Sequence, residues 1–206
     1  MWKIILIIIA VIIYFWQSNE PTIINSNITD IFPIEYISGL SIDTSPIQKN
    51  INRSKKSFQF NEYQITPLAE FQLVARVLSA KRYRTDHEAE LSPVDLALGW
   101  GPMSKQKNLD ELTISQSRRW YYWRTENFPI PRKEIETNSA NMHFIPGNPV
   151  IDKKLKSIQT GDTVKLMGYL VHVVGDDGWR WTSSMTRNDT GASSCEVILL
   201  EGISVN

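Results

Sequence analysis

The hydrophobic pattern divides the chain into an apolar start, an irregular polar stretch and a longer region of regular alternation. Thirteen consecutive apolar residues occupy positions 4–16. Pro, Asn, Ser and Thr then separate isolated isoleucines without a sustained period. Further on, apolar and polar positions alternate as they do in strands. We therefore expect a transmembrane signal anchor at residues 1–18, a tether at 19–57 and one globular domain at 58–206.

The clearest alternation lies in the C-terminal third of the chain. Residues 161–174 alternate on both sides of Gly168, where we expect the strand to bend or bulge. The sequence G175-D-D-G178 predicts a turn, so that a return strand follows at 179–183 and a last strand at 195–201. A bent strand, a hairpin and a closing strand are typical of a small, strongly curved sheet.

Earlier segments add shorter elements. Residues 70–79 alternate as a strand does, although the helical spacing of Leu68, Phe71, Val74 and Leu78 leaves a helix open. Residues 118–124 predict a strand with aromatic side chains on both faces. The other expected elements are a helical turn at 133–137, a strand at 141–145 and an amphipathic helix at 150–158.

The segment L91-S-P-V-D-L-A-L-G-W-G101 predicts a short helix. Ser92 is a favourable N-cap, Pro93 suits the first helical position, and Asp95 completes a capping box. Gly99 would end the helix in the left-handed conformation. Trp100 is then interpreted as a hydrophobic plug of the core, with a ligand-stacking role as the alternative.

Together these elements predict an α+β, mainly β fold. We expect an N-terminal transmembrane helix followed by a small, strongly curved antiparallel sheet or partly open barrel with short helices. About 150 residues are enough for one domain with its own core.

The apolar start has the features of an uncleaved anchor. A helix of this length covers roughly 20 Å of a hydrocarbon core of roughly 30 Å, and the uncharged residues 17–19 extend it. No small-residue cleavage site follows, and Trp2 and Trp16 bracket the run. Lys3 precedes the run and Lys49 is the next basic residue, which places the N-terminus in the cytoplasm. We expect a single-pass membrane protein with an extracytoplasmic domain, which for a bacterium means an inner-membrane protein with a periplasmic domain; a buried N-terminal element of a soluble protein is the alternative.

Composition limits the chemistry. The chain has 22 Lys plus Arg and 22 Asp plus Glu, so no broad basic field attracts nucleic acid, and no nucleic-acid partner is expected. The one cysteine excludes an intramolecular disulfide and cysteine-rich metal sites. No metal-binding or phosphate-loop motif is present, and we expect no cofactor.

Candidate catalytic residues come from two stretches. His143 lies in a short strand before a Pro-Gly pair, close to Asn141, although a hydrogen-bonded structural histidine is the commoner outcome. Arg187 and Asp189 lie in a loop rich in hydroxyl groups. Further nucleophile candidates without a known motif around them are Ser183, Ser184 and Cys195, with His172 as a second possible base. For Cys195 we expect a buried, inert strand residue.

Aromatic residues are the candidates for binding a ligand or partner, because one polar end and a large apolar face suit them to interfaces. They are Trp100, Trp120, Tyr121, Tyr122, Trp123, Trp179 and Trp181.

Several motifs are quite specific as a set. They are L91-S-P-V-D-L-A-L-G-W-G-P-M-S104, W120-Y-Y-W-R124, S139-A-N-M-H143, G168-Y-L-V171, G178-W-R-W-T-S-S184, R187-N-D-T-G191 and C195-E196. With them the chain resembles a widespread family of uncharacterised bacterial proteins with an N-terminal membrane segment. This resemblance implies one coherent domain and supplies no catalytic residues. Residues 161–170 are also similar to a strand of oligonucleotide-binding-type or nuclease-like barrels.

Two function classes follow. The leading hypothesis is a membrane-anchored, extracytoplasmic binding or scaffold subunit of a bacterial envelope-associated complex. Its partners would be other envelope proteins, and residues 1–18 would contact the lipid bilayer. The alternative is a membrane-tethered hydrolase acting on an envelope or nucleotide substrate, which requires the candidate catalytic side chains to converge.

Overall fold

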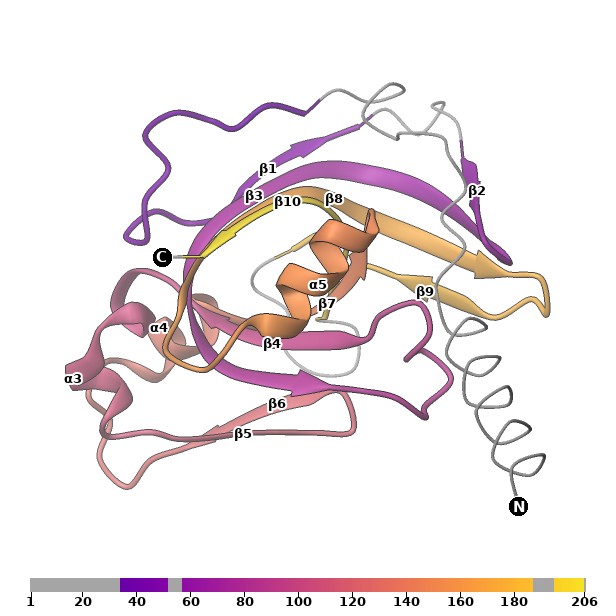
Figure 1. Ribbon diagram of the computed structural model, residues 1–206. Coiled ribbons are helices and arrows are strands. Elements are labelled where there is room, and N and C mark those ends of the chain that lie inside the picture. The colour runs from indigo at the N-terminus through magenta and orange to yellow at the C-terminus, as the bar shows by residue number, and fades with distance from the viewer. Residues whose placement is uncertain (1–33, 52–56, 187–194, 206) are drawn as a thin grey trace, which may run out of the picture.

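A large mixed β-sheet dominates the computed structural model, which describes residues 34–51, 57–186 and 195–205 (Figure 1). The few helices are short, so the domain is mainly β, as predicted. The expected anchor at 1–18 lies outside the described residues. Within them, no helix is long and apolar enough to cross a membrane.

Five strands of the sheet form a partly closed ring. In order around the ring they are β3 (Tyr63–Arg82), β4 (Val94–Gly99), β7 (Ser139–Pro146), β10 (Glu196–Val205) and β8 (Thr163–Gly175), and β8 pairs back onto β3. Two further strands, β1 (Ile47–Asn50) and β2 (Phe58–Phe60), pair with β3, and β9 (Arg180–Thr182) pairs with β8. The strands predicted in the C-terminal third are confirmed.

The expectation of an antiparallel sheet is wrong for one pair of strands. β10 inserts between β7 and β8 and pairs antiparallel with β8, but it runs parallel to β7. Strands of either direction bury alternate residues, so the alternation in the sequence carries no information about the direction of the neighbour. The direction is set by the order in which the strands come together.

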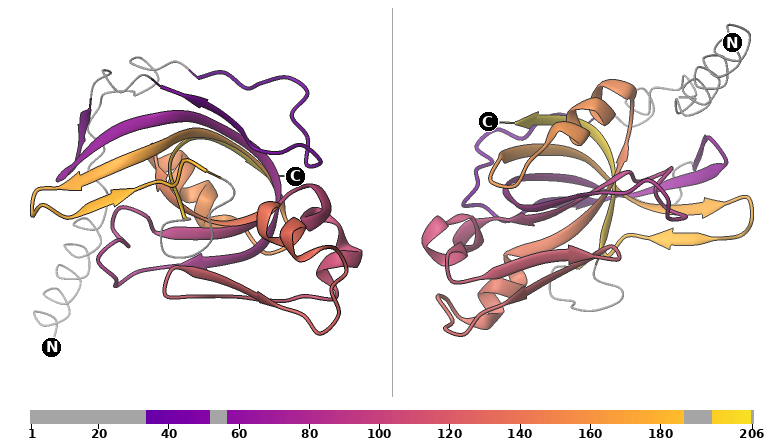
Figure 2. Two further views of the ribbon diagram at one scale, coloured as in Figure 1. Left: turned by 180° about the vertical axis from the view of Figure 1, so that it is seen from behind. Right: turned by 60° about the horizontal axis from the view of Figure 1, so that its bottom comes forward.

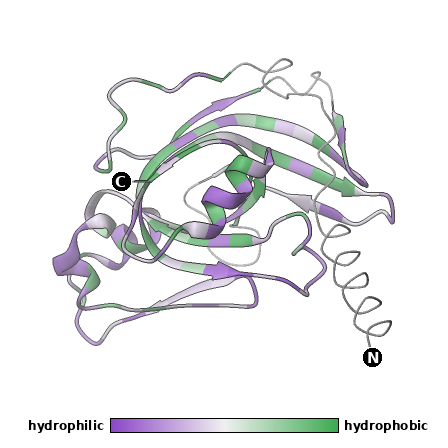
Figure 3. Cartoon of the chain, viewed as in Figure 1, coloured by the Kyte–Doolittle hydropathy of each residue, from purple (hydrophilic) through white to green (hydrophobic). Residues whose placement is uncertain are grey.

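The inward faces of the ring form the main core. Phe71, Leu96, Phe144 and Leu166 are among its fully buried residues. The helix α5 (Pro149–Ser157) lies across the opening of the ring in Figure 1 and has hydrophobic and hydrophilic positions in Figure 3. Its buried residues pack into the same cluster, which confirms the predicted amphipathic helix.

A separate hairpin lies over the outer face of β4 and β7. It consists of β5 (Thr113–Ser117) and β6 (Trp120–Arg124) (Figure 2). Its side chains Tyr121 and Trp123 pack on a small cluster around Ala97, whereas Tyr122 is 51% exposed. The aromatic strand thus has one face on a core, as predicted. Three short helices lie nearby: η1 (Gly101–Ser104), α3 (Gln106–Leu109) and α4 (Arg132–Thr137).

The helix predicted for residues 92–99 is wrong, because this segment is the strand β4. All six of its residues are buried, and β4 pairs with β3 on one side and β7 on the other. The local capping signals are outweighed by two ladders of hydrogen bonds and by burial of Val94, Leu96 and Leu98 in the ring core. Trp100 follows β4, is 1% exposed and packs in that core, as the plug interpretation predicts.

Gly168 allows two backbones to approach closely at a bulge. It lies opposite Leu200, and the register of β8 and β10 shifts there, so that Glu201 is the extra residue of β10. A Cβ on Gly168 would lie 2.1 Å from the carbonyl oxygen of Leu199. The expected irregularity is therefore present, but the bulge is in the partner strand.

Part of the predicted tether packs on the sheet. Ile34 is buried against the outer face of the sheet. The side chain of Gln72 accepts a hydrogen bond from the Ile37 backbone at 2.9 Å and donates one to the Glu35 carbonyl at 2.6 Å. Residues 34–51 therefore follow the domain surface, and β1 extends the sheet beyond β3.

We predict that Gly168→Ala destabilises the protein by about 2 kcal/mol or more, because the added methyl group meets a backbone oxygen that cannot move aside. Gly175→Ala is the matched control, since its nearest neighbour is the flexible end of the Asp177 side chain. Urea unfolding followed by tryptophan fluorescence measures both. Equal losses for the two variants would contradict this account of Gly168.

A second prediction concerns pH. Burial raises the pKa of Glu201 from its ordinary value of 4.5 to about 7, so the folded state holds this proton more tightly than the unfolded chain does. Stability should therefore fall as pH rises from about 4.5 to about 7. Glu201→Gln should gain ~1–2 kcal/mol over the natural chain at pH of about 8 and much less at about 4.5, measured by urea unfolding at both. An equal difference at both pH values would contradict it.

Candidate functional site

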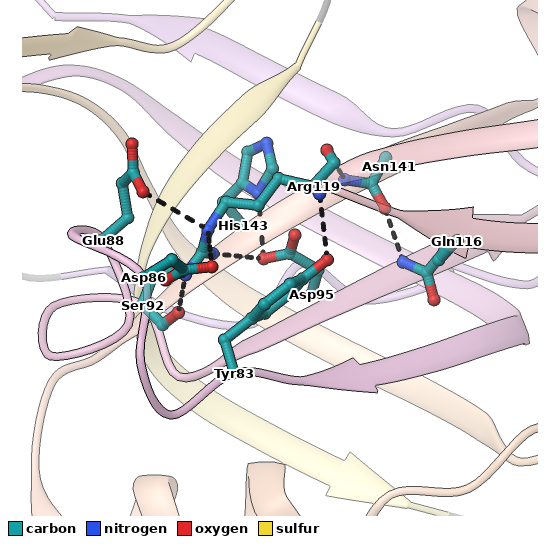
Figure 4. Close-up of polar contacts among 9 residues, drawn as sticks. All are labelled: Tyr83, Asp86, Glu88, Ser92, Asp95, Gln116, Arg119, Asn141 and His143. Atoms are coloured by element: carbon teal, nitrogen blue, oxygen red, sulfur yellow. Dashed lines mark hydrogen bonds and ion pairs between the residues drawn. The ribbon is translucent and has the colours of Figure 1, made fainter.

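A buried network of charged side chains lies between the ring and the β5–β6 hairpin (Figure 4). Asp95 of β4 and His143 of β7 are direct partners in the sheet register, and both point away from the ring core. They are 0% and 2% exposed. Arg119, from the turn of the hairpin, reaches over them from the other side. We call these residues, with Tyr83 and the partly exposed Asp86 and Glu88, the buried charge network.

Arg119 is the cation at the centre of the network. Its Nη1 lies 3.0 Å from Asp95 Oδ1. Its Nε and Nη2 donate to the two carboxylate oxygens of Asp86 at 3.1 and 2.6 Å, and the Ser92 carbonyl accepts a further bond at 3.0 Å. Oε2 of Glu88 lies 3.7 Å from Nε of Arg119. Such bidentate, charge-assisted bonds fix both the position and the orientation of a guanidinium group.

Tyr83 completes the surroundings of Arg119. The guanidinium carbon lies 4.1 Å from the centre of the Tyr83 ring, and the Tyr83 hydroxyl accepts a hydrogen bond from the Arg119 backbone at 3.1 Å. Burial, with a contribution from the Asp95 charge, raises the pKa of Tyr83 to about 12. This phenol therefore stays protonated at physiological pH.

His143 has the surroundings of a structural histidine. Its Nδ1 lies 2.9 Å from Asp95 Oδ1, and its ring centre lies 4.7 Å from that of Trp181. An imidazole held by a carboxylate is half of a catalytic triad. However, Asp95 also binds Arg119, and in the part of the chain that the structure describes no hydroxyl or thiol forms a hydrogen bond with His143. His143 is therefore a buried residue packed beside Asp95 and Trp181, but its Nδ1 makes no hydrogen bond of normal geometry with a described residue, so the expected hydrogen-bonded structural histidine is borne out only in its burial.

The turn that carries Arg119 is strained. Arg118 and Arg119 have φ of +50° and +63° between the paired residues Ser117 and Trp120. A two-residue hairpin turn with this backbone normally contains Gly or Asn, because positive φ costs other residues about 1–2 kcal/mol each. The contacts of Arg119 supply a reason for the strain, since they hold this side chain inside the network.

Asn141 ties the hairpin to β7. Its side-chain amide donates to the Arg119 carbonyl at 3.0 Å and accepts from Gln116 Nε2 at 2.6 Å. Asn141 and His143 lie on the same face of β7, two residues apart, so the structure brings these two candidates together. Arg187 and Asp189 lie outside the described residues. The convergence of all four candidates therefore stays a prediction.

Next to the network is a cavity of about 560 Å³, which we call the aromatic groove. It lies along β6 and is bounded by the start of β7 and of β10. Tyr122 and Phe128 are 51% and 54% exposed there. Its lining combines Trp100, Trp120, Tyr121, Tyr122, Trp123 and Phe128 with Arg124, Arg132, Glu136, Ser139, Asn141, Cys195 and Glu196, among others.

The predicted aromatic candidates fall into two groups. Trp100 and the four residues 120–123 all line the aromatic groove. Trp179 and Trp181 instead pack against each other, with ring centres 5.7 Å apart, beside a second apolar cluster. Trp181 also contacts His143, so it packs against the buried charge network, and neither tryptophan lines the groove.

The other candidate nucleophiles and the second candidate base, His172, lie in different surroundings. The Ser183 hydroxyl donates to the Ser184 carbonyl at 2.9 Å and accepts from the Val197 backbone at 3.1 Å. The His172 ring bonds to Thr182 at 2.7 Å. Cys195 is half-buried and borders the groove, which corrects the expectation of a buried strand residue. The reason is that β10 begins only at Glu196.

Sequence reasoning missed the central residue of the site. The aromatic residues of 118–124 predict a strand over the whole segment, whereas Arg118 and Arg119 form the turn before β6. The signal for a hairpin was weak, because residues 113–117 contain a single apolar residue, Ile114, and no Gly, Asn or Asp separates them from the aromatic strand at 120–124. Asp95 is predicted from the sequence to cap a helix, and that prediction gave no indication of its ion pair with Arg119.

Within the described residues, no group of three or more potential ligands is arranged to hold a metal ion.

We predict that Arg119→Met destabilises the protein by about 3–5 kcal/mol, because Asp95 would remain buried without its cation. Arg118→Met is the matched control, since Arg118 shares the turn and the sign of φ but is exposed, and should cost no more than about 0.5 kcal/mol. The double variant Arg119→Met/Asp95→Asn should recover part of the loss. Urea unfolding of the full chain in detergent tests all three, and similar losses for both arginines would refute the assignment.

Comparisons with known proteins assign no chemistry to this site. No protein-family model matches the chain, and no curated protein matches it. The resemblance to uncharacterised bacterial membrane proteins therefore stays an expectation.

Proposed function

We propose that the chain is a membrane-anchored, extracytoplasmic binding subunit of a bacterial envelope-associated complex, and that the aromatic groove binds its partner protein. The observation that carries this proposal is the pair of half-exposed aromatic side chains, Tyr122 and Phe128, beside a cavity. Aromatic and arginine side chains around a pocket are the groups that most often dominate the energy of protein interfaces.

The hairpin that forms the groove wall is held rigidly. Arg119 and Asn141 fix its turn, and Tyr121 and Trp123 pack its inner face onto the ring. A partner that binds such a surface loses less free energy in ordering it than it would on a mobile loop. This pre-organisation favours a binding role for the hairpin.

The arrangement of the ring also supports a binding module. In chain order the ring strands are β3, β4, β7, β8 and β10. The first strand, β3, pairs with the second, β4, and with the fourth, β8, and the third and fifth strands, β7 and β10, run parallel to each other. We infer a partly open barrel of the oligonucleotide-binding type, in which the face of the second and third strands commonly binds ligands. Here that face carries the hairpin and the groove. The balance of 22 basic and 22 acidic residues favours a protein over nucleic acid as the partner.

The alternative of a membrane-tethered hydrolase has less support. It would need a nucleophile or an activated water beside His143. The buried ring of His143 instead lies between Asp95 and Trp181. A binding role uses the exposed groove without that requirement.

Site-specific photocrosslinking in the membranes of the source cells tests the proposal. A photoreactive benzoylphenylalanine in place of Tyr122 or Phe128 should give the same discrete heavier adduct with one protein. Val150, 78% exposed on α5 and outside the groove, is the control position and should not give that adduct. Adducts that are absent from both groove positions, or equal at all three, would contradict a partner in the groove.

A further inference from the structure

The strand β6 has one edge without a neighbouring strand in the part of the chain that the structure describes. Ser117 and Trp120 close the two-residue turn, and in such a hairpin the closing pair exchanges both backbone hydrogen bonds. Bonded and non-bonded pairs then alternate along the hairpin. Tyr121 and Trp123 therefore direct their backbone N–H and C=O groups away from β5. No backbone group of the described residues bonds to them there.

The open edge of β6 lies along the aromatic groove. Every residue of β6 lines the groove, and residues 139–141 of β7 line it as well. The unpaired backbone groups thus meet a cavity rather than a flat surface. An extended peptide is the ligand that satisfies a row of alternating donors and acceptors at this spacing, as in other proteins that recognise peptides by strand addition. The five residues of β6 offer roughly 17 Å, enough for about five residues of a partner.

Charge on the hairpin restricts the sequence of such a peptide. Residues 113–124 contain three arginines and no acidic residue. Arg119 is held inside the buried charge network. Arg118 and Arg124 are exposed, and neither forms an ion pair with a described residue. Tyr122 and Arg124 lie two residues apart on the outer face of β6. A peptide strand beside β6 would therefore place its apolar and acidic side chains on that same face, at every second position of the peptide.

We propose that an extended, acidic segment of a partner protein adds to the open edge of β6 as a third strand of the hairpin sheet. The backbone groups of Tyr121 and Trp123 bond to it, Tyr122 packs on its apolar residues, and Arg118 and Arg124 pair with its carboxylates. This inference rests on the proposed function, because it specifies how the partner in the aromatic groove is recognised.

The probe for this inference is a peptide selected from a random library of 12-residue peptides on the full chain in detergent micelles. Selected peptides should be acidic with alternating apolar residues, and their dissociation constants can be measured by fluorescence anisotropy. Methylation of successive backbone nitrogens of the best peptide should weaken binding about tenfold at every second position and leave the intervening positions within about twofold. Tyr122→Ala and Arg124→Ala should weaken binding about fivefold or more, whereas Lys153→Ala on α5 should not.

Other outcomes separate this inference from the proposed function. Peptides that lose affinity with Tyr122→Ala but show no two-residue period on methylation would overturn strand addition and leave the groove as a binding site. Peptides that are insensitive to Tyr122→Ala, or a selection that yields none, would also overturn strand addition. The crosslinking result at Tyr122 and Phe128 then decides separately whether a partner occupies the groove.

Discussion

The position of the β5–β6 hairpin depends on the ion pairs of Arg119. Its guanidinium group binds Asp86 in the loop after β3 and Asp95 in β4, and Asp95 in turn contacts His143 in β7. The loop after β3, the strand β4 and the turn of the hairpin thus meet at one cation, and β7 joins them through Asp95. Asp95 is wholly buried, so a displaced hairpin would leave its charge without compensation, at a cost of several kcal/mol. This constraint keeps the wall of the aromatic groove in place.

Apolar packing and the buried charge network contribute in different ways. Burial of Tyr121 and Trp123 on the ring supplies favourable free energy that is tolerant of small displacements. A bidentate ion pair does not tolerate such displacements, because its hydrogen bonds depend on both distance and angle. The network therefore fixes the position of the hairpin on the ring, and this geometric demand accounts for an arginine at positive φ where Gly or Asn is usual.

Much of the fold could be predicted from the sequence where burial follows a local period. The strands β3, β8 and β9 and the helix α5 lie where alternation or helical spacing indicated them. The prediction failed at β4, since Ser92, Pro93 and Asp95 imitate a helix cap within a few residues. The two strands that flank β4, and not its local sequence, made it extended. The alternation of apolar and polar residues also gave no indication that β7 and β10 pair in parallel.

For the candidate site, the sequence by itself determined three properties: a chain without net charge, a strand with aromatic residues on both faces, and Asn141 and His143 two residues apart. Only the tertiary structure decided that Arg119 and Asp95, 24 residues apart, form a buried ion pair, and that β6 borders a groove with one edge unpaired. The physical reason is that side-chain and backbone alternation are local properties of the chain. Desolvation of a charge, and the choice of its partner, depend on segments that only folding brings together.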